Sequence, residues 1–212
     1  QSSVGIFSSK IKCGDCGSWY GSKVWHSNDK YRRIIWQCNH KFNGGEKCKT
    51  PHLDEETVKE LFIKAVNILT TEKEEIIANF QTIKGRLFDT GELEIEQSRL
   101  QEELNVVAEL IQQCVRENAH VALDQEEYQT RYRGLVERFD RTKARLDEVE
   151  HGIKEKQAQK EKIELFLEEL NRQEDVVTEF DEDQWYSLVD FVTVFNKEDI
   201  RFTFKDGTEI KV

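Results

Sequence analysis

Four cysteines in the first part of the chain have the spacing of a metal site. Cys13 and Cys16 are separated by two residues, and a glycine follows each of them, which permits a tight turn around one ion. Cys38 and Cys48 supply a second pair about twenty residues further along. Four thiolates in a tetrahedron suit structural zinc, and such a closed site leaves no open position for catalysis. We therefore expect these four cysteines to bind one structural Zn²⁺.

Other chemistry is open at this site. The second pair is more widely spaced than the first, so His40 or His52 could replace one of its cysteines. An iron–sulfur cluster or a redox Cys-x-x-Cys pair is a further alternative, although a redox pair belongs at a strand-to-helix turn within a βαβ unit, which the surrounding residues do not predict. The fifth cysteine, Cys114, falls on an apolar helix seam and is interpreted as a small buried hydrophobe.

Basic and aromatic residues alternate between the two cysteine pairs. On a two-stranded ribbon such residues could enter the major groove of DNA, where Arg and Lys pair with phosphates or guanine edges. The alternative is that the aromatic side chains form core and the basic ones only face solvent. The candidate DNA-binding residues are Lys23, Trp25, His26, Lys30, Arg32 and Arg33.

The elements that must position these residues are short strands followed by long helices. Aromatic and β-branched residues predict strands over residues 6–12, 19–25 and 31–37, with a hairpin turn at residues 27–29. Pro51 closes this region. A helix is then expected over residues 54–87, with Asp54 as its N-cap.

Two further helices are expected to form an antiparallel coiled coil. Residues 88–91 interrupt the helical pattern, which resumes over residues 92–118 and again after Asp124, an expected N-cap. From Tyr128 to Leu170 a strict 4-3 spacing holds, and ten of its thirteen positions are apolar or aromatic. Such regularity is a strong coiled-coil signal. Two helices joined by a short connection fold back on each other.

This arm has two features that we single out as candidate sites. Its tip, at about residues 118–124, carries apolar residues that could associate with another arm: Val121, Leu123, Tyr128 and Tyr132. If paired positions sum to about 243, Gly91 faces Gly152 in a weak part of the seam. Because glycine is a poor helix former, costing roughly 1 kcal/mol relative to alanine, this pair predicts a hinge. The outer arm would then be roughly 40 Å long.

The last part of the chain returns to strands. A short capped helix is expected near residue 181, followed by alternating strands and a tight turn at Asp206-Gly207. The predicted fold is therefore α+β: a small zinc-ribbon β domain with a long antiparallel helical hairpin inserted before its C-terminal strands. The expected divisions are residues 1–72 for the ribbon and first helix, 73–172 for the arm, and 173–212 for the completing helix and strands.

Charge is distributed unevenly along the chain. Residues 1–52 hold nine Lys/Arg and three Asp/Glu, which gives a charge of about +6. Because the whole chain has a net charge of −11, the other residues carry about −17 (−11 − 6). A basic module joined to an acidic one suggests two tasks. No apolar run approaches the roughly 18–20 residues of a membrane helix. Methionine is absent, so we expect a fragment of a longer protein, and cysteine usage without a secretion signal favours an intracellular setting.

The two cysteine pairs and their flanking residues resemble the recombinase zinc ribbon of large serine recombinases. The resemblance rests on the strings 13–18 (CGDCGS), 31–42 (YRRIIWQCNHKF) and 48–53, and on the closing string 202–210 (FTFKDGTEI). The long heptad segment is similar to the coiled coil inserted in that domain. In this family the catalytic serine domain lies elsewhere in the protein, so no catalytic residue is expected in this chain.

The resemblance implies several partners. It implies that the zinc ribbon binds double-stranded DNA at an attachment site, and that the arm contacts the arms of other recombinase subunits. It also implies a separate directionality factor as a partner and a bacterial or phage-encoded cytoplasmic protein. The alternative is a zinc-stabilised adaptor whose coiled coil binds proteins and whose ribbon binds no DNA. A hydrolase or redox enzyme is disfavoured, because the sequence suggests no nucleophile–base pair, phosphate loop or open metal site.

Overall fold

The structure is a computed structural model that describes residues 5–41, 47–120, 124–173 and 176–212. It divides into two units, one of Gln1–Gln81 with Lys162–Val212 and the other of Thr82–Glu161. In chain order the elements are β1 (Ile11–Cys13), β2 (Tyr20–Trp25), β3 (Arg33–Cys38), β4 (Leu53–Asp54), α1 (Glu55–Thr71), α2 (Lys73–Leu87), α3 (Gly91–His120), α4 (Gln125–Arg172), α5 (Glu182–Leu188), β5 (Val189–Asn196), β6 (Asp199–Phe204) and β7 (Glu209–Lys211).

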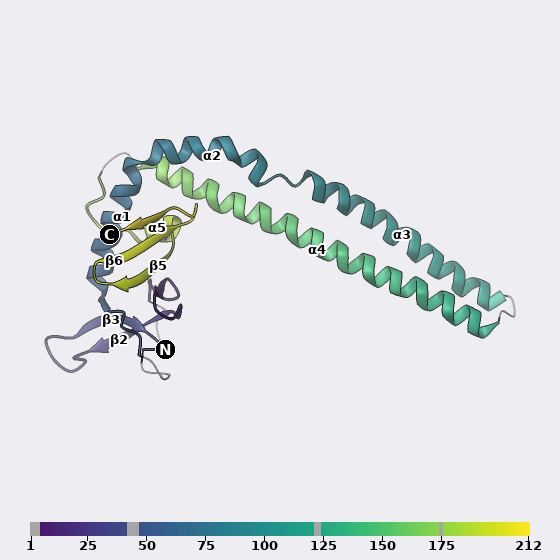
Figure 1. The fold of residues 1–212 in the computed structure, drawn as a ribbon, viewed down its shortest axis with the longest axis horizontal. Helices are drawn as coiled ribbons and strands as arrows, with labels where there is room; N and C mark the ends of the chain where they lie inside the picture. The colour runs from purple at the N-terminus through teal and green to yellow at the C-terminus, as the bar shows by residue number, and fades with distance from the viewer. Residues whose placement is uncertain (1–4, 42–46, 121–123, 174–175) are drawn as a thin grey trace. The chain divides into compact units, whose positions relative to one another are not determined.

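The strands of the first unit form two sheets (Figure 1). One is the antiparallel sheet β2-β3-β4, and the other has the order β1-β5-β6-β7. In the second sheet β1 runs parallel to β5, with Ile11 opposite Val192 and Cys13 opposite Val194. The predicted α+β fold, in which strands from both ends of the chain share a domain around a helical insertion, is confirmed. The C-terminal strands join β1, whereas the ribbon strands β2 and β3 belong to a separate sheet.

An aromatic cluster fills the first unit. The Phe7 ring meets Trp36 at 5.8 Å and Trp185 at 4.9 Å between ring centroids, and both contacts are edge-to-face. Phe62 of α1 packs on Trp185 at 5.4 Å. Edge-to-face aromatic pairs stabilise a core beyond the area they bury. The cluster joins α1, α5, β3 and the segment that leads into β1.

Two predicted elements are wrong in their bounds. The strand expected over residues 6–12 begins only at Ile11, because residues 6–10 form turns that direct Phe7 into the aromatic cluster. The helix expected over residues 54–87 is broken at Glu72, where α1 ends and α2 follows. Thr70 and Thr71 lie just before the break, and their hydroxyls donate to backbone carbonyls of the preceding turn. Such bonds compete with the helical pattern.

The second unit contains α3 and the part of α4 that runs alongside it (Figure 1). The predicted seam is confirmed at its centre, where Leu100 and Leu104 pack with Leu146, Val149 and Ile153. Ion pairs flank the seam, among them Arg138 with Glu103 at 3.0 Å and Arg145 with Glu96 at 2.8 Å. These pairs show that the two helices are antiparallel, because the residue number rises in α4 as it falls in α3.

Helix ends follow the expected capping in two of three cases. Asp124 accepts hydrogen bonds from the backbone N–H groups of Glu126 and Glu127, and Asp181 accepts one from Gln184. Asp54 lies at the N-cap position of α1 but makes no side-chain capping bond. Its carboxylate instead lies 3.3 Å from the guanidinium of Arg33.

Candidate metal centre and nucleic-acid interface

The first cysteine pair lies on a tight turn at the end of β1. Cys13 is the last residue of β1, and its carbonyl accepts a 2.8 Å hydrogen bond from the N–H of Gly17. Gly17 has a φ of 72°, in the left-handed region that favours glycine. The N–H of Gly14 donates to the carbonyl of Val194 in β5 at 2.8 Å. The turn is therefore fixed on the sheet that the C-terminal strands form.

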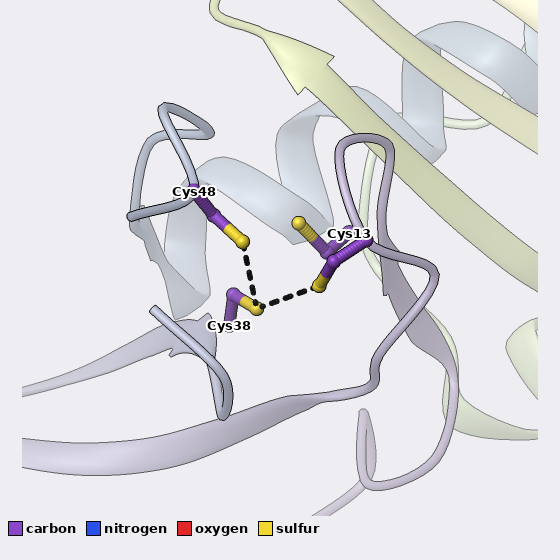
Figure 2. A group of neighbouring side chains, drawn as sticks. Cys13, Cys38 and Cys48 are labelled. Atoms are coloured by element: carbon purple, nitrogen blue, oxygen red, sulfur yellow. Dashed lines mark hydrogen bonds between the residues drawn. The ribbon is translucent and has the colours of Figure 1, made fainter. Parts of the chain in front are cut away.

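The second pair brings two more sulfurs to the same place. Cys38 ends β3, and its sulfur lies 3.6 Å from that of Cys16 and 4.0 Å from that of Cys48. All four sulfurs lie within 4.8 Å of one another, and Figure 2 shows those of Cys13, Cys38 and Cys48 converging. A zinc ion with four sulfurs at about 2.3 Å requires sulfurs about 3.8 Å apart. The four cysteines therefore fit one structural Zn²⁺.

The electrostatics of the thiols favour a bound cation. Hydrogen bonds from Ser18 lower the pKa of Cys16 to about 6, so this thiol ionises readily. The hydrogen bond to Cys16 raises the pKa of Cys48 to about 11, and burial raises the pKa of Cys38. One thiolate thus opposes ionisation of its neighbours. A divalent cation among them reverses that opposition, because a coordinating thiol is deprotonated outright.

Polar contacts around the sulfurs were not predicted from the sequence. The hydroxyl of Thr50, 1% exposed, lies 3.2 Å from the Cys13 sulfur and can donate to its thiolate form. The Tyr20 hydroxyl donates to the carbonyl of Pro51 at 2.8 Å, next to Thr50. The Asp15 carboxylate accepts a 2.6 Å bond from the backbone N–H of Lys49. Such outer contacts orient metal ligands. The only sequence signal for Thr50 is its position two residues after Cys48.

The alternative histidine ligands are not in the site. Among the described residues, the group that could hold a metal consists of the four cysteines alone. The ring of His52 packs instead on Trp25, with centroids 4.6 Å apart, and His40 is exposed. Cys114 is buried on α3, far along the chain from the metal centre, as its position on the seam indicated.

The basic hairpin consists of β2, β3 and the connection at residues 26–32. Lys23 lies opposite Ile35 and Trp25 opposite Arg33, so these side chains share one face of the antiparallel pair. Lys30 and Arg32 lie in the connection and are exposed. The structure therefore brings the six candidate residues onto one hairpin, although they are not equally free.

Four of the six contact other residues of the protein, and one of these is Lys30, whose ammonium lies 5.1 Å from the ring centroid of Tyr31. Arg33 lies over the ring of Trp25 at 5.4 Å and pairs with Asp54, while His52 covers Trp25 from its own segment. His26 is bonded to the Asp29 carboxylate at 3.1 Å. The same carboxylate accepts a 2.7 Å bond from the N–H of Tyr31, so Asp29 organises the connection.

Comparison with known proteins adds a family. Residues 6–67 match the family model of the recombinase zinc beta ribbon domain. This segment, less than half of the chain, is therefore similar to that domain. No curated protein matches the chain. The chain is also similar to a solved structure described as a crystal structure of an LSR–DNA complex, with 15% identity and a TM-score of 0.37 over 96% of this chain and 56% of that one. A TM-score this low supports no conclusion about this chain.

Outside residues 6–67, the structure locates the remaining candidate residues. Tyr128 and Tyr132 stack on one face of α4 with ring centroids 5.9 Å apart. Val121 and Leu123 lie outside the described residues. Gly91 begins α3 directly after the predicted break, and its N–H donates to the Asp89 side chain.

Gly152 of α4 lies beside the first residues of α3. A Cβ at Gly152 would meet Leu93, at 3.8 Å, and Gly91 is not among its neighbours. Lys156 donates a 2.6 Å hydrogen bond to the Asp89 carbonyl within the break.

Among the described residues, no helix is both long and apolar enough to cross a membrane.

Proposed function

We propose that this chain is the DNA-binding and subunit-contacting module of a large serine recombinase. The observation that carries the proposal is the recombinase zinc beta ribbon domain at residues 6–67, with its four converging cysteines and exposed basic hairpin. The zinc ion holds the hairpin in shape, and the hairpin contacts attachment-site DNA. The strand-breaking serine belongs to a domain outside this chain, and the parent protein acts in the cytoplasm of a bacterium.

The DNA contacts fall first on the basic residues that have no acidic partner. Lys23, Lys30 and Arg32 form no ion pair with any residue that the structure describes, whereas Arg33 and His26 are engaged by Asp54 and Asp29. Unpaired cations release counterions when they meet phosphates, which gives affinity and salt dependence. Arg33 and Trp25 then support the hairpin from within, and the connection at residues 26–32 makes the outermost contact.

The arm formed by α3 and α4 contacts other subunits of the recombinase. The seam between the two helices is apolar, and the outer surface of the arm is charged. The helices therefore pair with each other along the seam, and the region near the tip is the surface that contacts a partner. The stacked Tyr128 and Tyr132 lie near that tip. The break at residues 88–90, with Gly91 beside it, lets the arm bend. A directionality factor acts through this arm.

The test is selection of bound duplexes from a random DNA library, with zinc and after chelation. We expect a zinc-dependent enriched motif. The variant Lys30→Gln with Arg32→Gln should lose most of the affinity, and the matched control Lys154→Gln, an exposed lysine on α4, should retain it. Each lost phosphate contact reduces the slope of log affinity against log salt by about 0.9.

The outcomes separate two classes of protein. If a folded, zinc-loaded chain enriches no duplex and shows no salt-dependent binding, the ribbon is not a DNA module. The zinc-stabilised adaptor then becomes the better description.

A further inference from the structure

Three lysines from distant parts of the first unit lie near Asp190 of β5. The Lys10 ammonium donates to the backbone carbonyls of Val189 and Asp190, at 3.1 and 2.9 Å. Lys162, on α4, donates to the Asp190 carboxylate at 3.1 Å. The backbone N–H of Lys205, just after β6, donates to the carbonyl of Leu188, two residues before Asp190. Segments 10, 162, 190 and 205 are thus held together by their own hydrogen bonds.

The charges at this place do not balance. Asp190 is the carboxylate whose charge acts on both Lys10 and Lys205 among the described residues, and the other charges acting on them come from lysines. Three ammonium groups against one carboxylate leave a net charge of about +2 (3 − 1). Burial lowers the pKa of Lys10 and of Lys205, and neighbouring lysines lower both further. Clustered, partly buried cations are costly unless an anion compensates them.

The cluster is open enough for an anion to enter. The side chains of Lys162 and Asp190 are 40% and 41% exposed, so their charged ends face solvent. Lys10 is fixed by two carbonyl oxygens, which leaves one of its three N–H donors for a ligand. A phosphate group offers several acceptor oxygens to several donors at once, whereas the single Asp190 carboxylate binds Lys162 alone.

We propose that Lys10, Lys162 and Lys205 form a phosphate-binding site, separate from the basic hairpin. The phosphate comes from the backbone of bound DNA, in which case the site adds a second point of attachment, or from a free phosphate ion. The DNA source rests on the proposed function, but the site itself does not.

Two measurements on the whole zinc-loaded chain test the site. The first is thermal unfolding with increasing inorganic phosphate, at constant ionic strength maintained with chloride. The second is the salt dependence of DNA affinity. Both are compared among the wild type, the double variant Lys162→Gln with Lys205→Gln, the variant Asp190→Asn, and the control Lys197→Gln, an exposed lysine in the turn after β5.

The variants move in opposite directions if the site is real. The double variant should lose the phosphate-dependent rise in melting temperature, and its salt slope should fall by about 1.8, or about 0.9 for each lost contact. Asp190→Asn should strengthen phosphate binding, because the competing carboxylate is removed. The control should match the wild type. If the double variant fails to fold, the phosphate response of Asp190→Asn alone still tests the site.

The results also identify the source of the phosphate. Loss of both responses in the double variant assigns the DNA backbone. Loss of the phosphate response with an unchanged salt slope assigns a free phosphate ion. If the wild-type chain binds no DNA, the proposed function is refuted. Its response to inorganic phosphate still tests the phosphate-binding site. Equal phosphate responses and equal slopes in all variants would overturn the site.

Discussion

Replacing Gly14 by alanine should loosen the metal centre through a residue far along the chain. A Cβ at Gly14 would lie 2.4 Å from Cδ1 of Phe195 in β5, with two further ring atoms at 2.8 and 2.9 Å. Ordinary contacts begin at about 3.4 Å, so the ring or the turn must move by about 1 Å (3.4 − 2.4). Overpacking of this kind costs about 1–3 kcal/mol. The turn also carries Cys13 and Cys16, so the strain acts directly on two zinc ligands.

A double-mutant cycle isolates that contact. Gly14→Ala should weaken zinc retention against a chelator by about 5- to 150-fold, since 1.4 kcal/mol corresponds to tenfold. Phe195→Ala alone should have a smaller effect, because the ring is 38% exposed. The double variant should recover most of the loss, because removing the ring makes room for the new methyl group. Zinc release with a metallochromic indicator and thermal unfolding give the two readouts.

Gly134→Ala is the matched control. Nothing lies within 4 Å of a Cβ at Gly134 on α4, so alanine there should leave zinc retention unchanged. If Gly14→Ala retains zinc as well as the wild type, or if the double variant shows no recovery, then the turn does not depend on close packing of Gly14 against Phe195.

Two further predictions concern the metal centre and the arm. Thr50→Val removes the hydroxyl beside the Cys13 sulfur and should reduce zinc affinity roughly tenfold in chelator competition, with little change in fold; unchanged affinity would show that this hydroxyl does not support the thiolate. Gly91→Ala with Gly152→Ala should stiffen the arm, because alanine favours helix by roughly 1 kcal/mol per residue. Recombination by the parent protein should then change while DNA affinity does not, and unaltered recombination would remove the hinge.

Local patterns in the sequence predicted the metal centre and the arm well. The zinc ligands follow from the spacing of four cysteines, and the seam follows from the 4-3 repeat that buries Leu104 and Val149. The interruption at residues 88–90 was visible in its own residues. Each of these signals lies within a short window or a regular period, where residue type and geometry are directly linked.

Long-range pairings could not be predicted in the same way. Nothing local indicates that β1 pairs in parallel with β5, or that His52 covers Trp25 and so occupies a residue assigned to DNA. The turn at Phe7 was missed because its aromatic neighbours include Trp36 and Trp185, which lie 29 and 178 positions further along the chain. The lysine cluster around Asp190 was missed for the same reason, since its members are unremarkable lysines in sequence.

The parallel pairing of β1 with β5 has a consequence for the order in which the protein forms. During synthesis β1 emerges early, but its partner strand emerges only after both arm helices have left the ribosome. The helical arm makes mainly contacts between neighbouring turns and between two helices joined by a short connection, so it can form first. Lys73 donates a 2.6 Å bond to the carbonyl of Gln173, which shows that the chain returns close to its point of departure. A prefolded arm therefore shortens the loop that must close before β5 can pair with β1. The turn that carries Cys13 and Cys16 then docks against β5 last.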